Sequence, residues 1–412
     1  ILLLAAPLVM RIAGPGFTPD VQRLATDLTR VTVISIIFLG TSAVLTATLY
    51  ALQDFAFPAF CAALFNACII VAAVLFHRQL GVASLALGML VGAMAQVLLQ
   101  LPPLLRRRIR YALSVDLRDP DLQRILLLYA PVAASFVVSG VQVFIDRNLA
   151  SRTAEGSISA MQFATRLVQF PLGLIPTAIA GASLPVLAQQ ADNLSQFRQT
   201  LANGLRMIGF LILPAATGLA VLARPIVATI YQHGAFGPHD TALTSLALLL
   251  YLPGLPAAAV DQLLIYAFYA RKNTLTPVTV GVVAIGIYLA VALSLIGPLG
   301  MAGLVLANSA QWLSHAAIMT ILLWRMMGGL RGMGLGRMTG QTVMACVGMT
   351  LVMWSAARVV GLYLGDDTTM ANAVILLVAG SLGMLAFAGI AFWLRMDEVS
   401  ALVRTLHRRK PE

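Results

Sequence analysis

Residues 31–53, VTVISIIFLGTSAVLTATLYALQ, contain no charged side chain and are apolar enough to cross a lipid bilayer as a single helix. A transmembrane helix needs about 20 such residues. Comparable stretches recur along the 412-residue chain, in which 10% of residues are charged and 59% are hydrophobic, with a mean hydropathy of +0.89. Soluble domains carry roughly 25% charged residues. The composition therefore predicts an all-α polytopic membrane protein, and the apolar stretches, among them 241–260, give about 12 transmembrane helices.

The chain also repeats itself, since residues 17–106 and 236–325 match without a gap at a shift of 219 positions. The residues that recur in the same order are Phe17, Pro19, Tyr50, Pro58, Gly81 and Arg106, matched by Phe236, Pro238, Tyr269, Pro277, Gly300 and Arg325. Proline and glycine punctuate structure rather than fill it, so these matches carry more weight than matches of Leu or Ala. Six predicted helices separate the copies, which gives both the same orientation, as in transporters built from parallel repeats.

The repeat also predicts how the chain is organised. Two predicted helices, at about 122–146 and 157–188, precede the second copy but have no counterpart before the first. We therefore expect an N-terminal truncation of about a hundred residues and about 14 helices in the full-length protein. The expected blocks are a remnant of a first lobe with four helices, the first of them partial (1–105), a basic cytoplasmic linker (106–123), a six-helix second lobe (124–325), a cytoplasmic linker (326–340), two extra helices (341–395) and a cytoplasmic tail (396–412).

The formal net charge of +11 is concentrated in connections on one side of the predicted membrane. Most of the 27 Lys and Arg residues lie near 106–124, 198–206, 271–272, 325–337 and 395–410. This is the positive-inside pattern, and it predicts that these connections and the C-terminus are cytoplasmic. It also explains the positive charge without a nucleic acid partner.

A polar stripe runs along the predicted helix 157–188. Its members, spaced by 3, 4, 3 and 4 positions on one helical face, are Ser159, Gln162, Arg166, Gln169 and Gly173. Arginine keeps its charge in proteins, and its planar donor fork suits a phosphate. We therefore expect Arg166 to face a hydrated cavity. The alternatives are an ion pair between Arg166 and Asp146, and interhelical hydrogen bonds for the Ser and Gln positions.

Other polar residues inside apolar segments complete the set of candidates. The preceding helix carries Ser135, Ser139, Gln142 and Asp146 at spacings of 4, 3 and 4, and we place Gln142 and Asp146 in the cavity. Asp146 and Asp261 are candidates for ion or proton coupling, although Asp261 also fits as a partner of Arg166. His315 is more typical of a hydrogen-bonded core histidine than of a ligand. The sequence has no metal-ligand spacing and no phosphate-binding glycine loop, so we predict no catalytic site, no resident metal and no cofactor.

Residues 164–173, ATRLVQFPLG, followed by Leu184-Pro185, resemble the A-x-R-L-x-Q-x-P-x-G…L-P signature of the MurJ/MviN family. Further similar motifs are 14–17 (GPGF), 234–241 (GAFGPHDT), 267–277 (AFYARKNTLTP) and 300–304 (GMAGL). The resemblance covers nearly the whole chain. It implies a lipid II flippase of peptidoglycan synthesis in a bacterial cytoplasmic membrane, with lipid II, membrane lipids and the cell-wall synthesis machinery as expected partners. The fold it implies is two six-helix lobes around a cationic cavity, with two C-terminal helices that form a lipid-facing groove.

The resemblance also implies roles for single residues. Arg166 matches the functional arginine of the family's eighth helix, whose arginine and aspartate partners belong to the two helices that we expect to be missing. Asp146 matches an aspartate that is proposed to bind sodium in some relatives. The eleventh helix, 276–299, has no Asp, Asn, Glu or Gln, which argues against sodium coupling. Coupling to a monovalent cation and coupling to the membrane potential both stay open as the driving force. A polysaccharide-unit or drug exporter of the same superfamily, and a non-transporting membrane scaffold or fragment, are the alternative functions.

Overall fold

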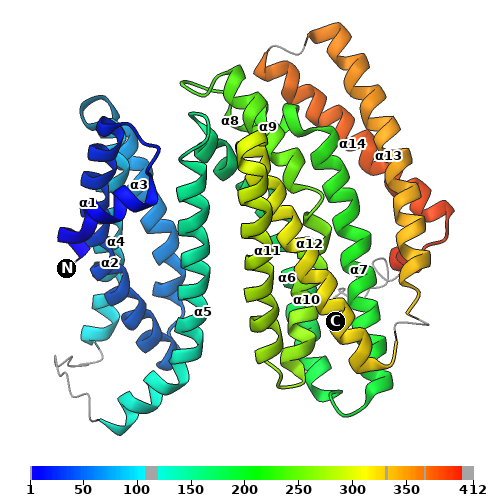
Figure 1. Cartoon of the computed structure of the whole chain (residues 1–412), viewed down its shortest axis with the longest axis horizontal. Coiled ribbons are helices and arrows are strands. Elements are labelled where there is room, and N and C mark those ends of the chain that lie inside the picture. Colours follow the sequence, from blue (N-terminus) through cyan, green and yellow to red (C-terminus); the bar gives the residue numbers. More distant parts are fainter. Residues whose placement is uncertain (1, 107–118, 330–332, 366–367, 401–412) are drawn as a thin grey trace. The chain divides into compact units, whose positions relative to one another are not determined.

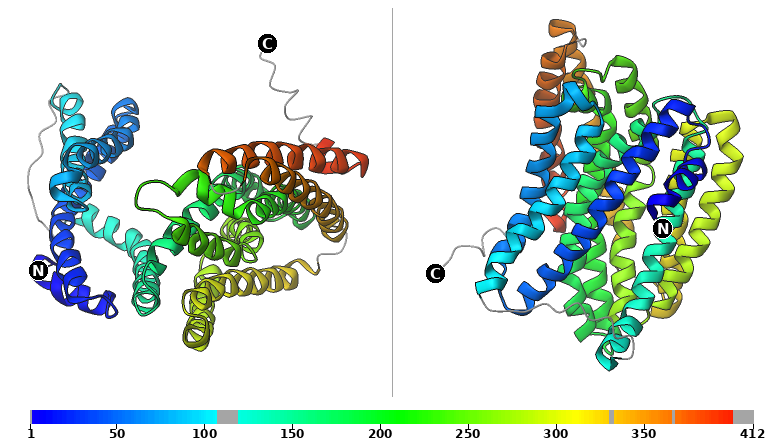
Figure 2. Two further views of the ribbon diagram at one scale, coloured as in Figure 1. Left: turned by 90° about the horizontal axis from the view of Figure 1, so that it is seen from above. Right: turned by 90° about the vertical axis from the view of Figure 1, so that its left-hand side faces the viewer.

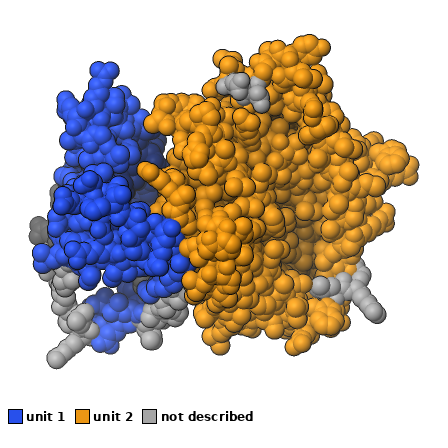
Figure 3. All heavy atoms as spheres, turned by 45° about the horizontal axis from the view of Figure 1, so that its top comes forward, with its two compact units in different colours: residues 1–152 blue, residues 153–412 orange. Residues whose placement is uncertain are grey.

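The computed structural model describes residues 2–106, 119–329, 333–365 and 368–400, and all its regular secondary structure in these ranges is helical (Figure 1). These residues form two compact units, 1–152 and 153–412 (Figure 3). Eight helices are long and apolar enough to cross a membrane, and α9 and α10 make a ninth span when taken together. The all-α polytopic class is thus confirmed.

The first unit contains five helices: α1 (Leu2–Ala13), α2 (Pro19–Ala51), α3 (Ala56–Leu80), α4 (Ala83–Arg106) and α5 (Pro120–Ala150). Glycines let α3 and α4 approach closely, since a Cβ at Gly88 would lie 2.7 Å from the Ile69 backbone. Polar side chains join α2 to α4, where Ser42 donates to Gln96 Oε1 over 3.0 Å. Such contacts replace the hydrophobic effect, which does not drive helices together within lipid.

The second unit contains nine helices: α6 (Ser157–Gln189), α7 (Leu194–Val221), α8 (Ala223–Tyr231), α9 (Pro238–Tyr251), α10 (Leu255–Ala270), α11 (Leu275–Leu299), α12 (Met301–Met327), α13 (Leu335–Leu364) and α14 (Thr369–Trp393). The centre of this unit is α10, which packs against α6, α7 and α12 and fully buries Ala259, Leu263 and Ala267. The pair α13 and α14 lies along α7 (Figures 1 and 2). A methionine-rich core that includes Met338, Met349 and Met353 fills that interface.

Two features change the predicted helix boundaries. The single helix expected at 241–260 is broken at residues 252–254, so that α9 and α10 are bent by 48°. Pro253 and Pro256 cause the break, because proline has no N–H to donate and clashes with the preceding turn. The nine-residue α8 has no counterpart among the predicted helices. The described residues form 14 helices, close to the predicted number of about 12, and eight or nine of these meet the length and hydropathy of a membrane span.

The division into units places α5 with the helices before it. Its C-terminal end contacts the turn between α1 and α2, where the Asn148 side chain donates to the Ile12 carbonyl and the Gly16 N–H donates to Ser151 Oγ over 3.4 Å. The repeat groups the same helix with the second lobe, which starts at residue 124 in that scheme. The lobe boundaries inferred from the repeat remain a prediction.

Candidate functional site: the polar face of α6

The polar stripe of α6 is an exposed face of that helix. Ser159, Gln162, Arg166 and Gln169 are all exposed. The opposite face is fully buried at Ala164, Val168 and Ala180, where α6 packs into the second unit. The spacing of the stripe in the sequence therefore corresponds to a single, accessible face, hereafter the α6 polar face.

The α6 polar face extends further than the sequence predicted. Thr177 follows Gly173 by one helical turn and is exposed on the same side of α6. Its hydroxyl accepts a hydrogen bond from Gln262 Nε2 of α10 over 3.1 Å. The four-residue step from Gly173 to Thr177 was a visible signal for the extension, whereas the contribution of α10 depends on the packing of two helices.

Aromatic rings lie beside Arg166. Phe163, one turn earlier on α6, packs against Tyr231 of α8 and Phe236, with ring centroids 4.8 and 5.3 Å apart. Burial raises the pKa of Tyr231, and the positive charge of Arg166 opposes that rise. The Arg166 guanidinium thus lies near the aromatic cluster of Phe163, Tyr231 and Phe236, at the end of α8. Phe170 and Leu174 add exposed apolar surface beside the α6 polar face.

Gln142 and Asp146 lie on α5, in the first unit. Both are partly buried, and each has an interaction partner. The side chains of Ser135 and Ser139 lie outside the described residues. The ion pair between Asp146 and Arg166 remains a prediction, because these two residues belong to different units.

The structure gives Asp261 a partner other than Arg166. Its Oδ1 lies 2.8 Å from His315 Nδ1 of α12, and the two side chains are only 15% and 13% exposed. His315 is therefore a hydrogen-bonded histidine inside the helix bundle, as its sequence context indicated. The pairing joins α10 to α12 on the inside of the second unit.

An apolar groove of about 490 Å³ lies between α13 and α14. Its lining residues are Leu351, Val352, Ser355, Ala356, Val359, Val360, Val378 and Leu382. Ser355 contributes the one hydroxyl of this set. A groove of this chemistry suits a hydrocarbon chain and offers little to a polar head group.

The family model described as "Lipid II flippase MurJ" matches residues 1–391. The chain belongs to the MurJ family. The match includes α6 with its polar face and reaches nearly to the end of α14. Members of the MurJ family are named as flippases, which are transporters rather than enzymes. Among the described residues, no group of three or more His, Cys, Asp and Glu side chains is placed to hold a metal ion.

Named MurJ relatives extend this assignment. A probable lipid II flippase MurJ of Vibrio cholerae serotype O1 is 34% identical over 63% of this chain and 48% of its own length. The lipid II flippase MurJ of Burkholderia cenocepacia is 31% identical over 69% of this chain and 57% of its own length. The chain thus spans about half of the length of these curated relatives. A solved structure titled "Lipid II flippase MurJ, inward closed conformation" has the same fold, with a TM-score of 0.77 and 22% identity over 95% of this chain and 79% of that one.

Proposed function

We propose that this protein moves lipid II, an undecaprenyl-pyrophosphate-linked disaccharide-pentapeptide, from the inner to the outer leaflet of the bacterial cytoplasmic membrane by alternating access. The observation that carries the proposal is the exposed guanidinium of Arg166 on the α6 polar face, in a chain that matches the MurJ family over residues 1–391. The alternative of a drug antiporter predicts an acidic binding face, and Arg166 argues against it.

The pyrophosphate is the group that Arg166 would bind. Guanidinium and phosphate form paired, charge-assisted hydrogen bonds that are roughly twice as strong as neutral ones. The neutral amides of Gln162 and Gln169 stand within one turn on either side of Arg166 and would receive sugar hydroxyls or peptide groups. The hydrogen-bonded pair of Thr177 and Gln262 extends this surface by two turns along α6.

The groove between α13 and α14 would hold part of the polyprenyl tail. The interior of a bilayer is as apolar as the groove, so the hydrophobic effect does not favour transfer of the tail from the lipid into the groove. The groove would act through close van der Waals contact and would orient the tail while the head group crosses. This role requires a groove whose shape matches the tail. The packing of α13 against α14 determines that shape.

The basic ends of the second unit support the proposed orientation, with the C-terminus in the cytoplasm. Arg271, in the turn after α10, lies over the Phe197 ring at the start of α7, 5.9 Å from its centroid. Arg198, the residue after Phe197, donates to the carbonyl of Met327 at the end of α12 over 3.4 Å. Three basic connections of this unit therefore meet at one end, which is the arrangement that the positive-inside rule requires. A monovalent cation or the membrane potential would supply the driving force.

The test uses Arg166→Ala in the full-length protein, expressed in cells depleted of their own lipid II flippase. We expect the variant to reach wild-type abundance, to fail to restore growth and to leave newly made lipid II in the inner leaflet, as measured by its accessibility from outside. Arg152→Ala, an exposed arginine in the turn after α5, is the matched control and should restore growth. Outer-leaflet lipid II at wild-type levels with Arg166→Ala would refute the assigned role.

A further inference from the structure

The helix α12 holds the bent pair α9–α10 at two points. The first is the break itself. Ser309 Oγ of α12 donates to the Leu250 carbonyl over 2.7 Å, which satisfies an acceptor at the broken end of α9. Gly254 allows the close approach, since a Cβ there would lie 2.8 Å both from Ser309 Cα and from the Trp312 ring. The broken segment between α9 and α10 therefore packs closely against this part of α12.

The second point is the pair formed by Asp261 and His315. His315 follows Ser309 by six residues on α12, and Asp261 follows Gly254 by seven on α10, so the pair lies about two helical turns beyond the break. Its two atoms are 2.8 Å apart. The histidine ring also donates to the Pro277 carbonyl of α11, so three helices contact the pair.

The surroundings of the pair offer no other charge among the contacts that the structure describes. From α11, Gly281 lies against the ring, with its Cβ position 3.9 Å from His315 Nε2. From α6, Thr177 bonds to Gln262, the neighbour of Asp261. From α7, Gly204 packs against Leu263. None of these groups is ionisable, so the carboxylate and the imidazole are the ionisable groups among these described contacts.

The charge of the pair depends on how many protons it holds. With one proton, the aspartate and the histidine neutralise each other. Loss of that proton leaves a net negative charge in a mostly buried place. Gain of a second proton leaves a net positive charge and replaces the carboxylate acceptor that joins α10 to α12 by the weaker, neutral carbonyl of a carboxylic acid. Both changes are costly inside a membrane unless water or a helix movement compensates. We therefore expect changes in protonation to be coupled to movements of these helices.

We propose that Asp261 and His315 form an intramembrane proton-binding site, and that its protonation state sets how firmly α12 holds the bend between α9 and α10. Proton binding and the response of the bend are independent of the substrate. The further consequence, that the site makes lipid transport depend on pH, rests on the proposed flippase function.

Trp312 provides a probe at the bend, because its ring lies against Gly254 and its centroid is 5.9 Å from that of Tyr251. The experiment measures the emission of the full-length protein in lipid nanodiscs between about pH 5 and pH 9, the range in which histidine changes charge. The contribution of Trp312 is the difference between this protein and Trp312→Phe. We expect that contribution to titrate, and the titration to be lost in His315→Asn. His233→Asn, on an exposed turn after α8, is the matched control and should keep it. A titration that persists in His315→Asn, or no titration in the unsubstituted protein, would overturn the proposal.

The double variant Asp261→Asn/His315→Asn covers the case in which the single variant fails to fold. Two amides can keep a hydrogen bond between α10 and α12 without binding a proton. We expect the double variant to fold and to keep the Trp312 emission of the state in which α12 holds the bend. We expect that emission not to titrate with pH. If it titrates like the unsubstituted protein, the site lies elsewhere.

Lipid II translocation in proteoliposomes, measured over the same pH range, separates the two proposals. We expect the rate to vary with pH in the unsubstituted protein and to be independent of pH in the double variant. Absence of translocation at every pH, with the Trp312 titration intact, would refute the flippase function and leave the proton site standing. Normal translocation without a His315-dependent titration would refute the proton site alone.

Discussion

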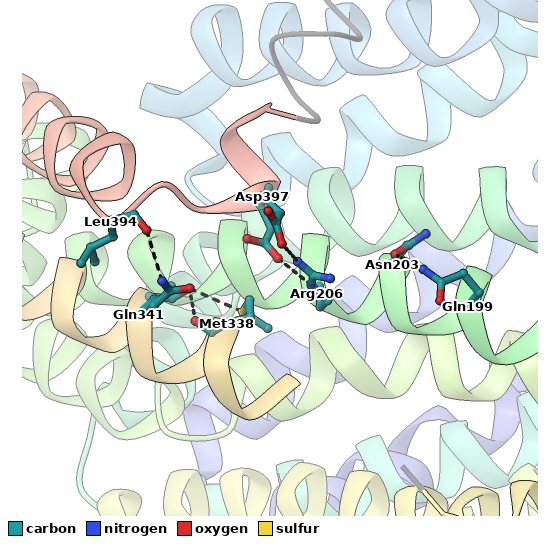
Figure 4. A network of polar contacts seen from close by, with 9 residues as sticks. Gln199, Asn203, Arg206, Met338, Gln341, Leu394 and Asp397 are labelled. Atoms are coloured by element: carbon teal, nitrogen blue, oxygen red, sulfur yellow. Dashed lines mark hydrogen bonds and ion pairs between the residues drawn. The ribbon is translucent and has the colours of Figure 1, made fainter. Parts of the chain in front are cut away.

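Arg206 of α7 and Glu398, which follows α14, form an ion pair in which Nε and Oε1 are 2.7 Å apart. Arg206 Nη2 also contacts Asp397 Oδ2 at 3.0 Å, and Gln341 of α13 donates to the Leu394 carbonyl over 3.3 Å (Figure 4). Glu398 is only 4% exposed, whereas Asp397 is 81% exposed. Polar contacts thus join the C-terminal end of α14 to α7 and to the start of α13. The apolar groove lies between these two helices, α13 and α14.

Arg206→Ala should destabilise the protein strongly, because it leaves the buried Glu398 carboxylate without its partner. Breaking a buried pair in this way costs about 3 kcal/mol. Asp397→Asn removes a contact of an exposed side chain and should cost less than about 1 kcal/mol. Thermal unfolding of the two variants in detergent measures the difference. Equal unfolding temperatures for the two variants would show that Glu398 does not depend on Arg206.

Gly383→Val should separate α13 from α14 and distort the groove. A Cβ at Gly383 would lie 2.1 Å from Met353 Cγ, so the buried Met353 side chain must be displaced or the helices must move apart, and overpacking of this kind costs about 1–3 kcal/mol. Gly389, on the same helix, has no atom within 4 Å of its Cβ position, and Gly389→Ala should be tolerated. Growth of a flippase-depleted strain and the unfolding temperature report the two effects. If the proposed tail groove is correct, Gly383→Val should impair growth even at a temperature at which it remains folded.

Ser309→Ala should loosen the break between α9 and α10. The Leu250 carbonyl would lose its donor, and an unsatisfied buried acceptor costs about 1–3 kcal/mol. Ser294→Ala is the control, since the hydroxyl of that exposed residue bonds only to a carbonyl of its own helix, Ala290. Hydrogen exchange in residues 250–256 should accelerate in Ser309→Ala and stay unchanged in Ser294→Ala. Unchanged exchange in both would mean that the two prolines alone maintain the bend.

Local patterns predicted the helical class and the α6 polar face, because both depend on composition and on spacings of three and four residues. The contacts that join distant segments did not follow from such patterns. Asp261 and His315 are 54 positions apart, and Arg206 and Glu398 are 192 positions apart. Which polar residue meets which is decided by the packing of whole helices. The break after α9 lies between these cases. Pro253 and Pro256 are a local signal for it that the prediction of a single helix over 241–260 did not use, whereas the contacts of Ser309 and Gly254 depend on how α12 packs.

Thr177→Val tests whether the α6 polar face extends beyond the stripe that the sequence predicted. The substitution keeps the shape of the side chain and removes the hydroxyl that accepts the bond from Gln262. A hydrogen bond of this kind contributes about 1 kcal/mol, so a role in holding the substrate head group predicts a roughly fivefold loss of lipid II translocation with little change in stability. Thr165→Val is the control on the same helix, because that hydroxyl bonds to the Met161 carbonyl within α6. Translocation equal to that of the unsubstituted protein in Thr177→Val would confine the substrate surface to the turns around Arg166. A loss confined to Thr177→Val would show that α10, through Gln262, helps to form the surface that receives the head group.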